Sequence, residues 1–208
     1  MKRIPSKETL TLAGATLVAS LAVIVAANAS KPVPAPPGLR AYTKAEQVKR
    51  GEYLVTIGGC NDCHTPWIIQ PDGKPGPDLT RTLSGHPQQF PITQPARLTS
   101  DRWGVAIAPM NTAFSGPWGV SFAANLTPDR LTGTGIWTFD TFKNTIRNGR
   151  HWGVARPLLP PMPWFNYRKM TDEDLAAVFA YLRTLKPIHN EVPVPLPPAT
   201  QQTQTASK

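Results

Sequence analysis

Apolar residues recur at helical spacing in three stretches of the chain. The clearest stretch lies between Thr171, a capping residue followed by acidic side chains, and Pro187, which ends the helix. Its apolar positions share one helical face: Leu175, Val178, Phe179, Leu182 and Leu185. We expect this face to be buried against the core of the domain.

Two further helices are predicted from their end signals. The first begins near Thr43 and continues through "KAEQVKRGEYLVTIG" until Gly58 and Gly59 end it. The second is "TFDTFKNTIRN", with Thr138 as the capping residue before it and Gly149 after it. Short helices are therefore the main expected structure, and the fold class is mainly α.

The stretch from residue 65 to residue 124 carries little helical pattern. Two short apolar runs, "GVAIA" at 104–108 and "GVSFA" at 119–123, predict an antiparallel pair of strands. The chain holds 24 prolines and 15 glycines, which favour loops over long regular elements. A loop of this length in a compact domain indicates a functional role or packing around something other than side chains.

The ends of the chain differ in composition from the middle. Residues 1–29 combine a basic start, an apolar run at 10–27 and a small-residue "ANA" site, which fits a cleaved signal peptide or a retained membrane anchor. Residues 30–40 predict a proline-rich linker, and residues 192–208 predict a disordered tail. Residues 41–191 remain as one folded domain.

The net charge is strongly positive. The full chain carries +9, and residues 30–208 alone carry +7. A basic surface suits an acidic protein partner or an anionic membrane face. Nucleic acid is not an expected partner, because the chain carries an export signal and its basic residues form no dense run.

Only two cysteines occur in the chain, Cys60 and Cys63, and His64 follows them directly. A zinc site would need further ligands from the other histidines: His86, His151 and His189. A thioredoxin-like pair would need a strand before the motif, whereas a helix precedes it here. A disulfide between cysteines three apart is sterically awkward and gives no reason for the histidine.

The spacing C-x-x-C-H is typical of covalent attachment of c-type haem, which explains all three residues. The thiols bind the haem vinyl groups and the imidazole binds the iron. Met162 in "LLPPMPWF" is the best candidate for the second axial ligand, because flanking prolines hold it in an apolar setting. Met110 in "APMNT" is the next candidate, and Met170 is expected to pack in the core.

The order of these features resembles class I cytochrome c. The segments "NLTPDRLTGTGIWTFDTFKNTIRNGR", "LLPPMPW" and "MTDEDLAAVFAYLRTLKPIHNEVP" are similar to the modules in cytochrome c subunits of periplasmic alcohol and aldehyde-type dehydrogenases, over roughly residues 45–193. The resemblance implies a cytochrome c fold with a long proline-rich loop insertion and a small β-hairpin. It implies thioether bonds at Cys60 and Cys63, His64 as proximal ligand and Met162 as distal ligand.

Two departures from that family matter. Its subunits usually string several modules together, whereas this sequence has a single C-x-x-C-H, which predicts one haem. Small cytochromes c carry a G-P-x-L segment whose proline carbonyl accepts a hydrogen bond from the proximal imidazole. "GPDL" at 76–79 matches, so Pro77 is one candidate for that role, but its loop has a different length.

Other residues allow two interpretations each. Asn125 fits either a hydrogen bond at the haem edge or a local turn with Thr127 and Pro128. Three aromatic residues are candidates for packing on the haem or in the ordinary core: Trp137, Trp164 and Tyr167. Three cations are candidates for neutralising haem propionates or for the solvated surface: Arg147, Arg150 and Arg156.

These features predict a periplasmic one-electron carrier rather than an enzyme. The expected donor is a dehydrogenase, of which the protein is either a free partner or a non-catalytic subunit, and the expected acceptor is a respiratory oxidase or cytochrome. A different class remains open: a five-coordinate haem sensor or peroxidase-like enzyme, for which the distal position must be vacant. A structural or metal-binding protein without haem is the third alternative.

Overall fold

The computed structural model describes residues 42–97 and 102–198. The predicted signal or anchor and the predicted linker lie outside these residues. Within the described residues, no helix has both the length and the apolar character needed to span a membrane.

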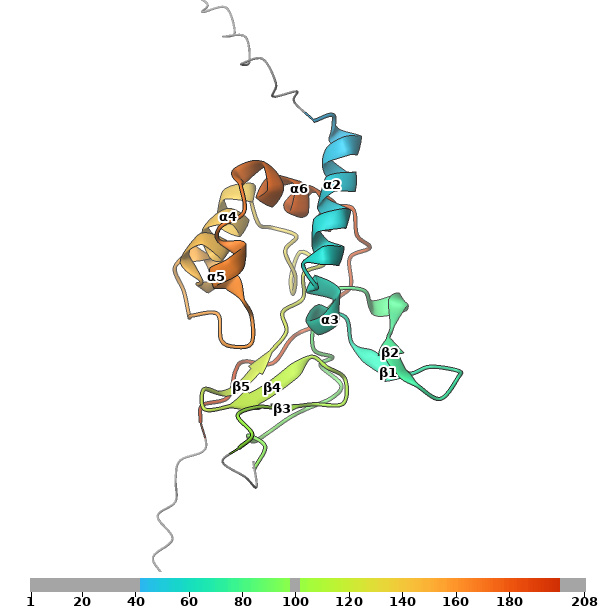
Figure 1. The fold of residues 1–208 in the computed structure, drawn as a ribbon, viewed down its shortest axis with the longest axis vertical. Helices are drawn as coiled ribbons and strands as arrows, with labels where there is room; N and C mark the ends of the chain where they lie inside the picture. Colours follow the sequence, from blue (N-terminus) through green and yellow to red (C-terminus); the bar gives the residue numbers. More distant parts are fainter. Residues whose placement is uncertain (1–41, 98–101, 199–208) are drawn as a thin grey trace, which may run out of the picture. The chain divides into compact units, whose positions relative to one another are not determined.

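Two of the predicted helices form the main crossing of the domain. Helix α2 (Lys44–Ile57) begins at Thr43, whose hydroxyl accepts a hydrogen bond from the Glu46 N–H at 3.3 Å. Helix α6 (Asp172–Leu182) begins at Thr171, which caps it in the same way. Both helices and both capping residues are confirmed, but α6 ends at Leu182 and not next to Pro187, so Leu185 lies beyond the helix. Figure 1 shows α2 along one side of the domain, with α4, α5 and α6 beside it.

The crossing of α2 and α6 depends on a small residue. A Cβ added to Gly51 would lie 1.9 Å from the carbonyl oxygen of Ala177 in α6. The two helix backbones are therefore too close at this point for any residue other than glycine. Beside this contact, Arg50 donates to both carboxylate oxygens of Asp174, at 2.9 and 3.3 Å. The pair fixes the relative position of the helices.

Apolar side chains from α2, α4 and α6, together with Leu83 of the 65–124 stretch, form the larger core of the domain. Helix α4 (Phe139–Asn148) is capped by Thr138 and ends at Gly149, as predicted. Phe142 of α4 stacks on Phe179 of α6 with ring centroids 5.4 Å apart. The buried members of this core, called the helical core below, are Val55, Leu83, Phe142, Ile146, Leu175, Val178 and Leu182.

Several short elements were not predicted. A one-turn helix, α3 (Cys60–His64), follows α2, and α5 (Trp164–Tyr167) precedes α6. Single 3-10 turns occur at Leu79–Arg81 and His151–Gly153. Too few residues contribute to each of them for a periodic pattern to be visible in the sequence.

The 65–124 stretch contains two small antiparallel sheets rather than one open loop. Strands β1 (Trp67–Ile69) and β2 (Pro75–Pro77) form a hairpin. The second sheet has the order β3 (Ala106–Ile107), β4 (Ala113–Gly116) and β5 (Gly119–Phe122). The predicted pairing of the 104–108 and 119–123 runs is wrong, because β4 lies between them and pairs with both.

The segment after residue 191 adds to this second sheet. Leu196 and Val120 of β5 exchange two backbone hydrogen bonds of 3.0 Å each. Val192 and Leu196 also pack against a small apolar cluster of Ala113, Val120 and Phe122, called the sheet core below. Residues 192–198 are therefore held on the sheet, whereas their composition predicted disorder; residues 199–208 lie outside the described part.

Candidate functional site

The end of α2 delivers the C-x-x-C-H motif into a single helical turn. Gly58 ends α2, and Gly59 adopts a left-handed conformation with φ of 66°, which turns the chain into α3. Residues three apart on a helix share a face, so Cys60 and Cys63 lie on the same side of this turn. Both thiols are free. The geometry presents two unoxidised sulfur atoms beside His64.

The imidazole of His64 is held in one tautomer. Its Nδ1 lies 2.8 Å from the carbonyl oxygen of Ala124, which can only accept, so Nδ1 donates its proton. No group among the described residues forms a hydrogen bond with Nε2, and this nitrogen keeps its lone pair. Burial lowers the pKa of His64, which favours the neutral ring that a metal ligand requires.

The candidate role of Pro77 is wrong. Its carbonyl accepts a hydrogen bond from the Gln70 side chain at 3.1 Å, on the β1–β2 hairpin. The acceptor of the His64 proton is Ala124, which lies 60 residues after the histidine and just beyond strand β5. Every residue has a backbone carbonyl, so the sequence pattern cannot show which remote carbonyl accepts this hydrogen bond.

Burial also sets the state of the two thiols. It raises the pKa of Cys60 to about 11, and it raises the pKa of Cys63 as well. Both sulfurs are therefore protonated at neutral pH. Neither thiol is activated as a thiolate, in contrast to the redox-active cysteine of a thioredoxin-like pair, whose pKa is lowered.

Segments of the 65–124 stretch hold the motif from outside. The N–H of Gly85 donates to the carbonyl of His64 at 2.8 Å. The side chain of Asn111 donates to the carbonyl of Asp62 at 2.6 Å. Thr65, directly after the motif, accepts a hydrogen bond from the Leu83 N–H at 2.9 Å. One role of this long stretch is thus to fix the backbone around the motif.

Met162 lies in a half-buried position and packs against the helical core, as does Cys60. The sheet contacts the same segment, since the hydroxyl of Ser121 donates to the carbonyl of Pro160 at 2.5 Å. Met170 also packs against the helical core, as expected. Met110 is not part of that core, and its carbonyl accepts from Trp67 of β1 at 3.0 Å. Of the two candidate ligands, only Met162 shares a core with the motif.

Asn125 has a local role. Its side-chain oxygen accepts hydrogen bonds from the N–H and the hydroxyl of Thr127 at 3.0 and 2.7 Å, and its amide donates to the carbonyl of Ile188 at 2.8 Å. The side chain is 4% exposed. The interpretation of Asn125 as part of a local turn is confirmed.

Of the three candidate aromatic residues, Trp137 and Tyr167 pack against the helical core, and Trp164 packs over the end of α4. The Tyr167 hydroxyl donates to the carbonyl of Gly58, which ties α5 to the end of α2. Trp164 covers Gly149, where an added Cβ would lie 2.4 Å from the ring. Trp137 packs on the helical core on one side and faces other rings on the other.

The candidate cations differ in their pairing. Arg147 forms an ion pair with Asp172 at 2.6 Å, so its charge is already matched. Arg150 and Arg156 are exposed, and their side chains donate to the carbonyls of Ala155 and Pro157 rather than to carboxylates.

The zinc interpretation gains no support. Among the described residues, no three His, Cys, Asp or Glu side chains are grouped so that they could hold a metal ion. His86 is fully buried and uses both ring nitrogens, with the Thr112 hydroxyl at 2.9 Å and the Phe90 carbonyl at 2.8 Å.

Relatives of known type match most of the chain. It is 30% identical over 150 residues to the gluconate 2-dehydrogenase cytochrome c subunit of Pantoea cypripedii, covering 71% of this chain and 24% of that protein. It is 30% identical over 142 residues to the fructose dehydrogenase cytochrome subunit of Gluconobacter japonicus, covering 68% of this chain and 22% of that protein. A diheme cytochrome c-type protein of Cereibacter sphaeroides is 29% identical over 177 residues, covering 83% and 49%.

The chain thus spans between 22% and 49% of the length of these relatives. No family model matches the sequence. The C-x-x-C-H turn, the helices around it and the three relatives nevertheless all indicate the same kind of module. The chain contains a cytochrome c module, related to those of dehydrogenase cytochrome c subunits.

Proposed function

We propose that the protein is a one-electron carrier with one covalently bound haem c. Cys60 and Cys63 would form the two thioether bonds, the Nε2 atom of His64 would bind the iron, and Met162 would supply the other ligand. The observation that carries this proposal is the state of His64: its Nδ1 donates to Ala124 at 2.8 Å while Nε2 keeps its lone pair, one helical turn from two free thiols.

When bound, the haem supplies an iron centre that gains or loses one electron. The residues of this chain fit that chemistry. The hydrogen bond to Ala124 orients the His64 ring and makes it a more basic ligand. The thioether of Met162 stabilises the ferrous state and raises the reduction potential relative to a second histidine. Met162 itself is partly covered by the helical core.

The partners are inferred from the relatives, several of which are named as cytochrome subunits of gluconate, fructose and alcohol dehydrogenases. We propose that a dehydrogenase donates the electron and that a respiratory oxidase or another cytochrome accepts it. On this proposal the chain is not itself a catalyst, and it works in the periplasm, either freely or tethered through residues 10–27.

Haem content tests the proposal directly. Protein made in a host with the c-type maturation machinery should contain one haem per chain in a pyridine haemochrome assay. A chain that folds and is exported without haem would contradict the proposal.

The axial ligand needs a separate test. Met162→Ala should retain the haem, lower the reduction potential and allow carbon monoxide to bind, because the second axial position opens. Met110→Ala is the matched control and should leave all three properties unchanged. If the unaltered protein already binds carbon monoxide readily, the five-coordinate alternative, a sensor or peroxidase-like enzyme, is correct instead.

A further inference from the structure

Residues 150–157 form a closed surface loop, called the 150–157 loop below. The N–H of His151 donates to the carbonyl of Arg156 at 2.9 Å, and the N–H of Ala155 donates to the carbonyl of His151 at 2.8 Å. The guanidinium of Arg150 donates to the carbonyl of Ala155 at 2.9 Å. The loop is therefore a defined structure rather than an irregular connection.

This loop exposes two large apolar side chains. Val154 is 79% exposed and Trp152 is 42% exposed. Trp152 also adopts a left-handed backbone with φ of 57°, which is unfavourable for a bulky residue. Its left-handed backbone costs stability, and a large part of its ring stays exposed, so Trp152 is a candidate for a role in binding.

Trp152 is connected to the interior through a second ring. Its ring centroid lies 5.4 Å from that of Trp137, and Trp137 packs against the helical core. Cys60 and Met162 pack against the same core. Side chains in contact thus lead from the exposed Trp152 to the residues that flank the proposed haem.

The charge around the loop is not balanced. Residues 149–170 contain four basic residues and no acidic one. Arg150 and Arg156 donate to backbone carbonyls, and neither forms an ion pair with a carboxylate of the described residues. Elsewhere in the described domain, by contrast, Arg50 and Lys143 each face an aspartate. Unmatched cations on a surface attract an acidic partner.

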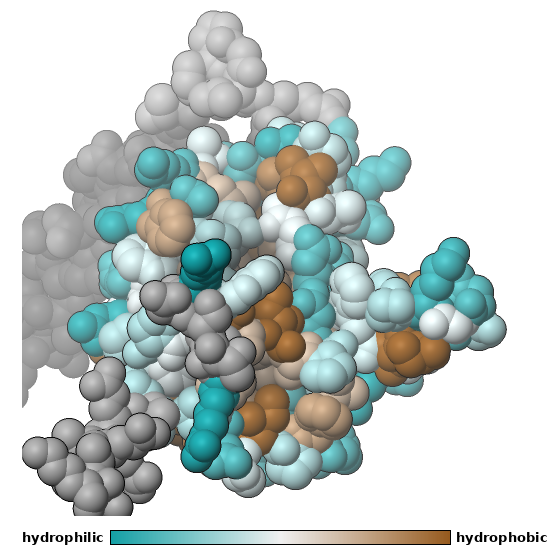
Figure 2. Space-filling model, turned by 60° about the horizontal axis from the view of Figure 1, so that its bottom comes forward, coloured by the Kyte–Doolittle hydropathy of each residue, from teal (hydrophilic) through white to brown (hydrophobic). Residues whose placement is uncertain are grey.

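Another exposed apolar surface lacks this feature. The β1–β2 hairpin projects from the domain with apolar surface on it, as Figure 2 shows, and Ile69 there is 69% exposed. In its turn, however, Asp72 lies 3.7 Å from Lys74, so the two charges offset each other. Exposed apolar side chains together with unmatched positive charge therefore distinguish the 150–157 loop from the β1–β2 hairpin.

We propose that the 150–157 loop is the docking surface for the acidic face of a redox protein partner. This inference rests on the proposed function. One electron passes from the reduced centre of the partner to the ferric haem of this protein, which becomes ferrous while the partner is oxidised by one electron. No proton or atom is transferred. With two exposed apolar side chains and a few cations, the interface is small and dissociates readily, as a carrier requires.

A protein partner fits the loop better than a membrane does. Binding to anionic lipid needs the charge and the apolar side chains but no connection to the interior. The ring contact between Trp152 and Trp137 gives such a connection, which a route for electrons from a protein partner would use.

The test uses the full-length holoprotein and a ten-residue glutamate peptide as a defined acidic probe. Amide chemical shifts in an NMR titration should change mainly within the 150–157 loop. The double variant Arg150→Gln/Arg156→Gln keeps side-chain donors while removing two charges, and its affinity should fall by about threefold to tenfold. Melting temperature and haem spectrum serve as checks of folding.

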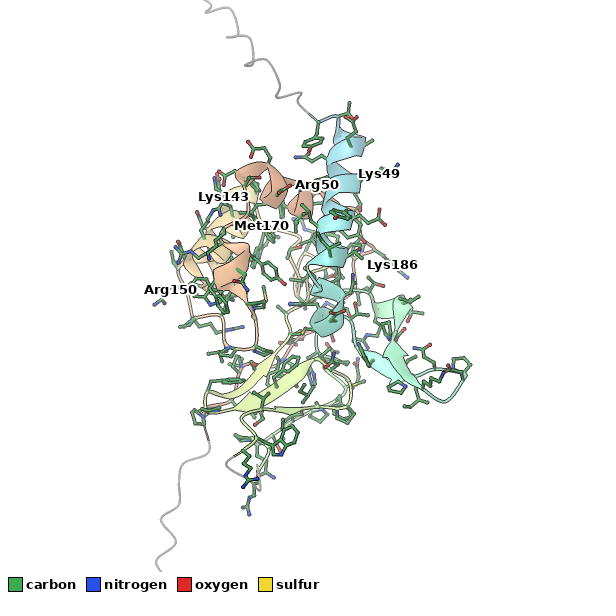
Figure 3. The ribbon with its side chains drawn as sticks, in the orientation of Figure 1. Lys49, Arg50, Lys143, Arg150, Met170 and Lys186 are labelled. Carbon is green, nitrogen blue, oxygen red and sulfur yellow. The ribbon has the colours of Figure 1, made fainter. Side chains whose placement is uncertain are left out.

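The matched control is Lys49→Gln/Lys186→Gln, which removes the same charge. Figure 3 shows Lys49 and Lys186 on the opposite side of the domain from Arg150. This control should change the affinity by less than about twofold. Equal losses in both double variants, or shift changes that miss the loop, would overturn the proposal.

Two further readouts separate the alternatives. Sedimentation with phosphatidylglycerol vesicles should not depend on Arg150 and Arg156; if it does while the peptide fails to bind, the loop is a membrane surface instead. Peptide binding does not require iron chemistry. A protein that binds the peptide at the loop but lacks haem would refute the proposed function and leave the acidic docking surface intact.

Discussion

The helical and sheet regions of the domain contribute differently to the candidate site. The helical core draws on α2, α4 and α6, and both Cys60 and Met162 pack against it. The sheet core has only three buried members, and its region gives His64 a single backbone carbonyl, that of Ala124. The comparison indicates that the helices position Cys60 and Met162, and that the sheet region adjusts the orientation and basicity of His64 as a ligand.

The largest effect should come from emptying the helical core. Leu175 is 1% exposed, and Leu175→Ala should lower the free energy of unfolding by roughly 2–5 kcal/mol. Its counterpart in the sheet core, Val120→Ala, should cost about 1.5 kcal/mol, since it removes two methyl-sized groups. Denaturant unfolding measures both. Only the helical variant should alter the haem spectrum, and an altered spectrum in Val120→Ala alone would reverse the comparison.

The link between the two regions is the next point to break. Gly85 has φ of 78°, and an added Cβ would lie 2.5 Å from the Ala123 carbonyl and 2.7 Å from the Ala124 carbonyl. Gly85→Ala should therefore displace the carbonyl that accepts the His64 proton. Its free energy of unfolding should fall by about 1–3 kcal/mol more than that of a Gly→Ala variant at an uncrowded left-handed glycine.

Gly73→Ala is the matched control, because its φ is 81° and nothing lies within 4 Å of the added Cβ. The Gly85 variant should also raise the reduction potential, since a weaker hydrogen bond makes His64 a less basic ligand. Equal stabilities and equal potentials in the two variants would show that Ala124 does not influence the ligand.

The helix crossing should respond to a single added methyl group. Gly51→Ala places a Cβ where the Ala177 carbonyl oxygen is 1.9 Å away, so α2 and α6 must separate. We expect a loss of about 1–3 kcal/mol in denaturant unfolding. Gly104→Ala, where no atom lies within 4 Å, should change stability by less than about 0.5 kcal/mol. Similar free energies of unfolding for the two variants would mean that α2 and α6 can move apart without loss of stability.

The smallest effect concerns pH. Hydrogen bonding from Arg147 lowers the pKa of Asp172 below its ordinary value. A carboxyl with a lowered folded-state pKa stabilises the protein above its unfolded pKa, about 3.9, and this contribution disappears as pH falls through the folded value. Asp172→Asn should therefore lower the melting temperature slightly at pH 6 and not at pH 2. An equal difference at both pH values would contradict the pairing.

Local signals were sufficient for the long helices. Thr43, Thr138 and Thr171 each cap a helix as predicted, because a capping hydroxyl acts on backbone N–H groups only a few residues away. The motif at the end of α2 was readable for the same reason, since its three residues lie within one turn.

Contacts between distant segments could not be predicted in this way. The strand β4 (Ala113–Gly116) pairs on both sides, and neither pairing is specified by its own four residues. The Ala124 carbonyl and the pairing of Leu196 with Val120 likewise depend on how the chain returns in space. The likeness of "GPDL" to the family's G-P-x-L motif made Pro77 one candidate, because that motif is local in the sequence. The acceptor of the His64 proton is instead Ala124, 60 residues away.

Mass spectrometry of the intact, denatured protein tests the central claim most directly. If Cys60 and Cys63 hold one haem, the chain made in a host with the maturation machinery should carry the added mass of one haem after denaturation. Cys60→Ala/Cys63→Ala should carry none. A double variant that keeps the added mass, or an unaltered chain that lacks it, would contradict the assignment of this protein as a covalent haem carrier.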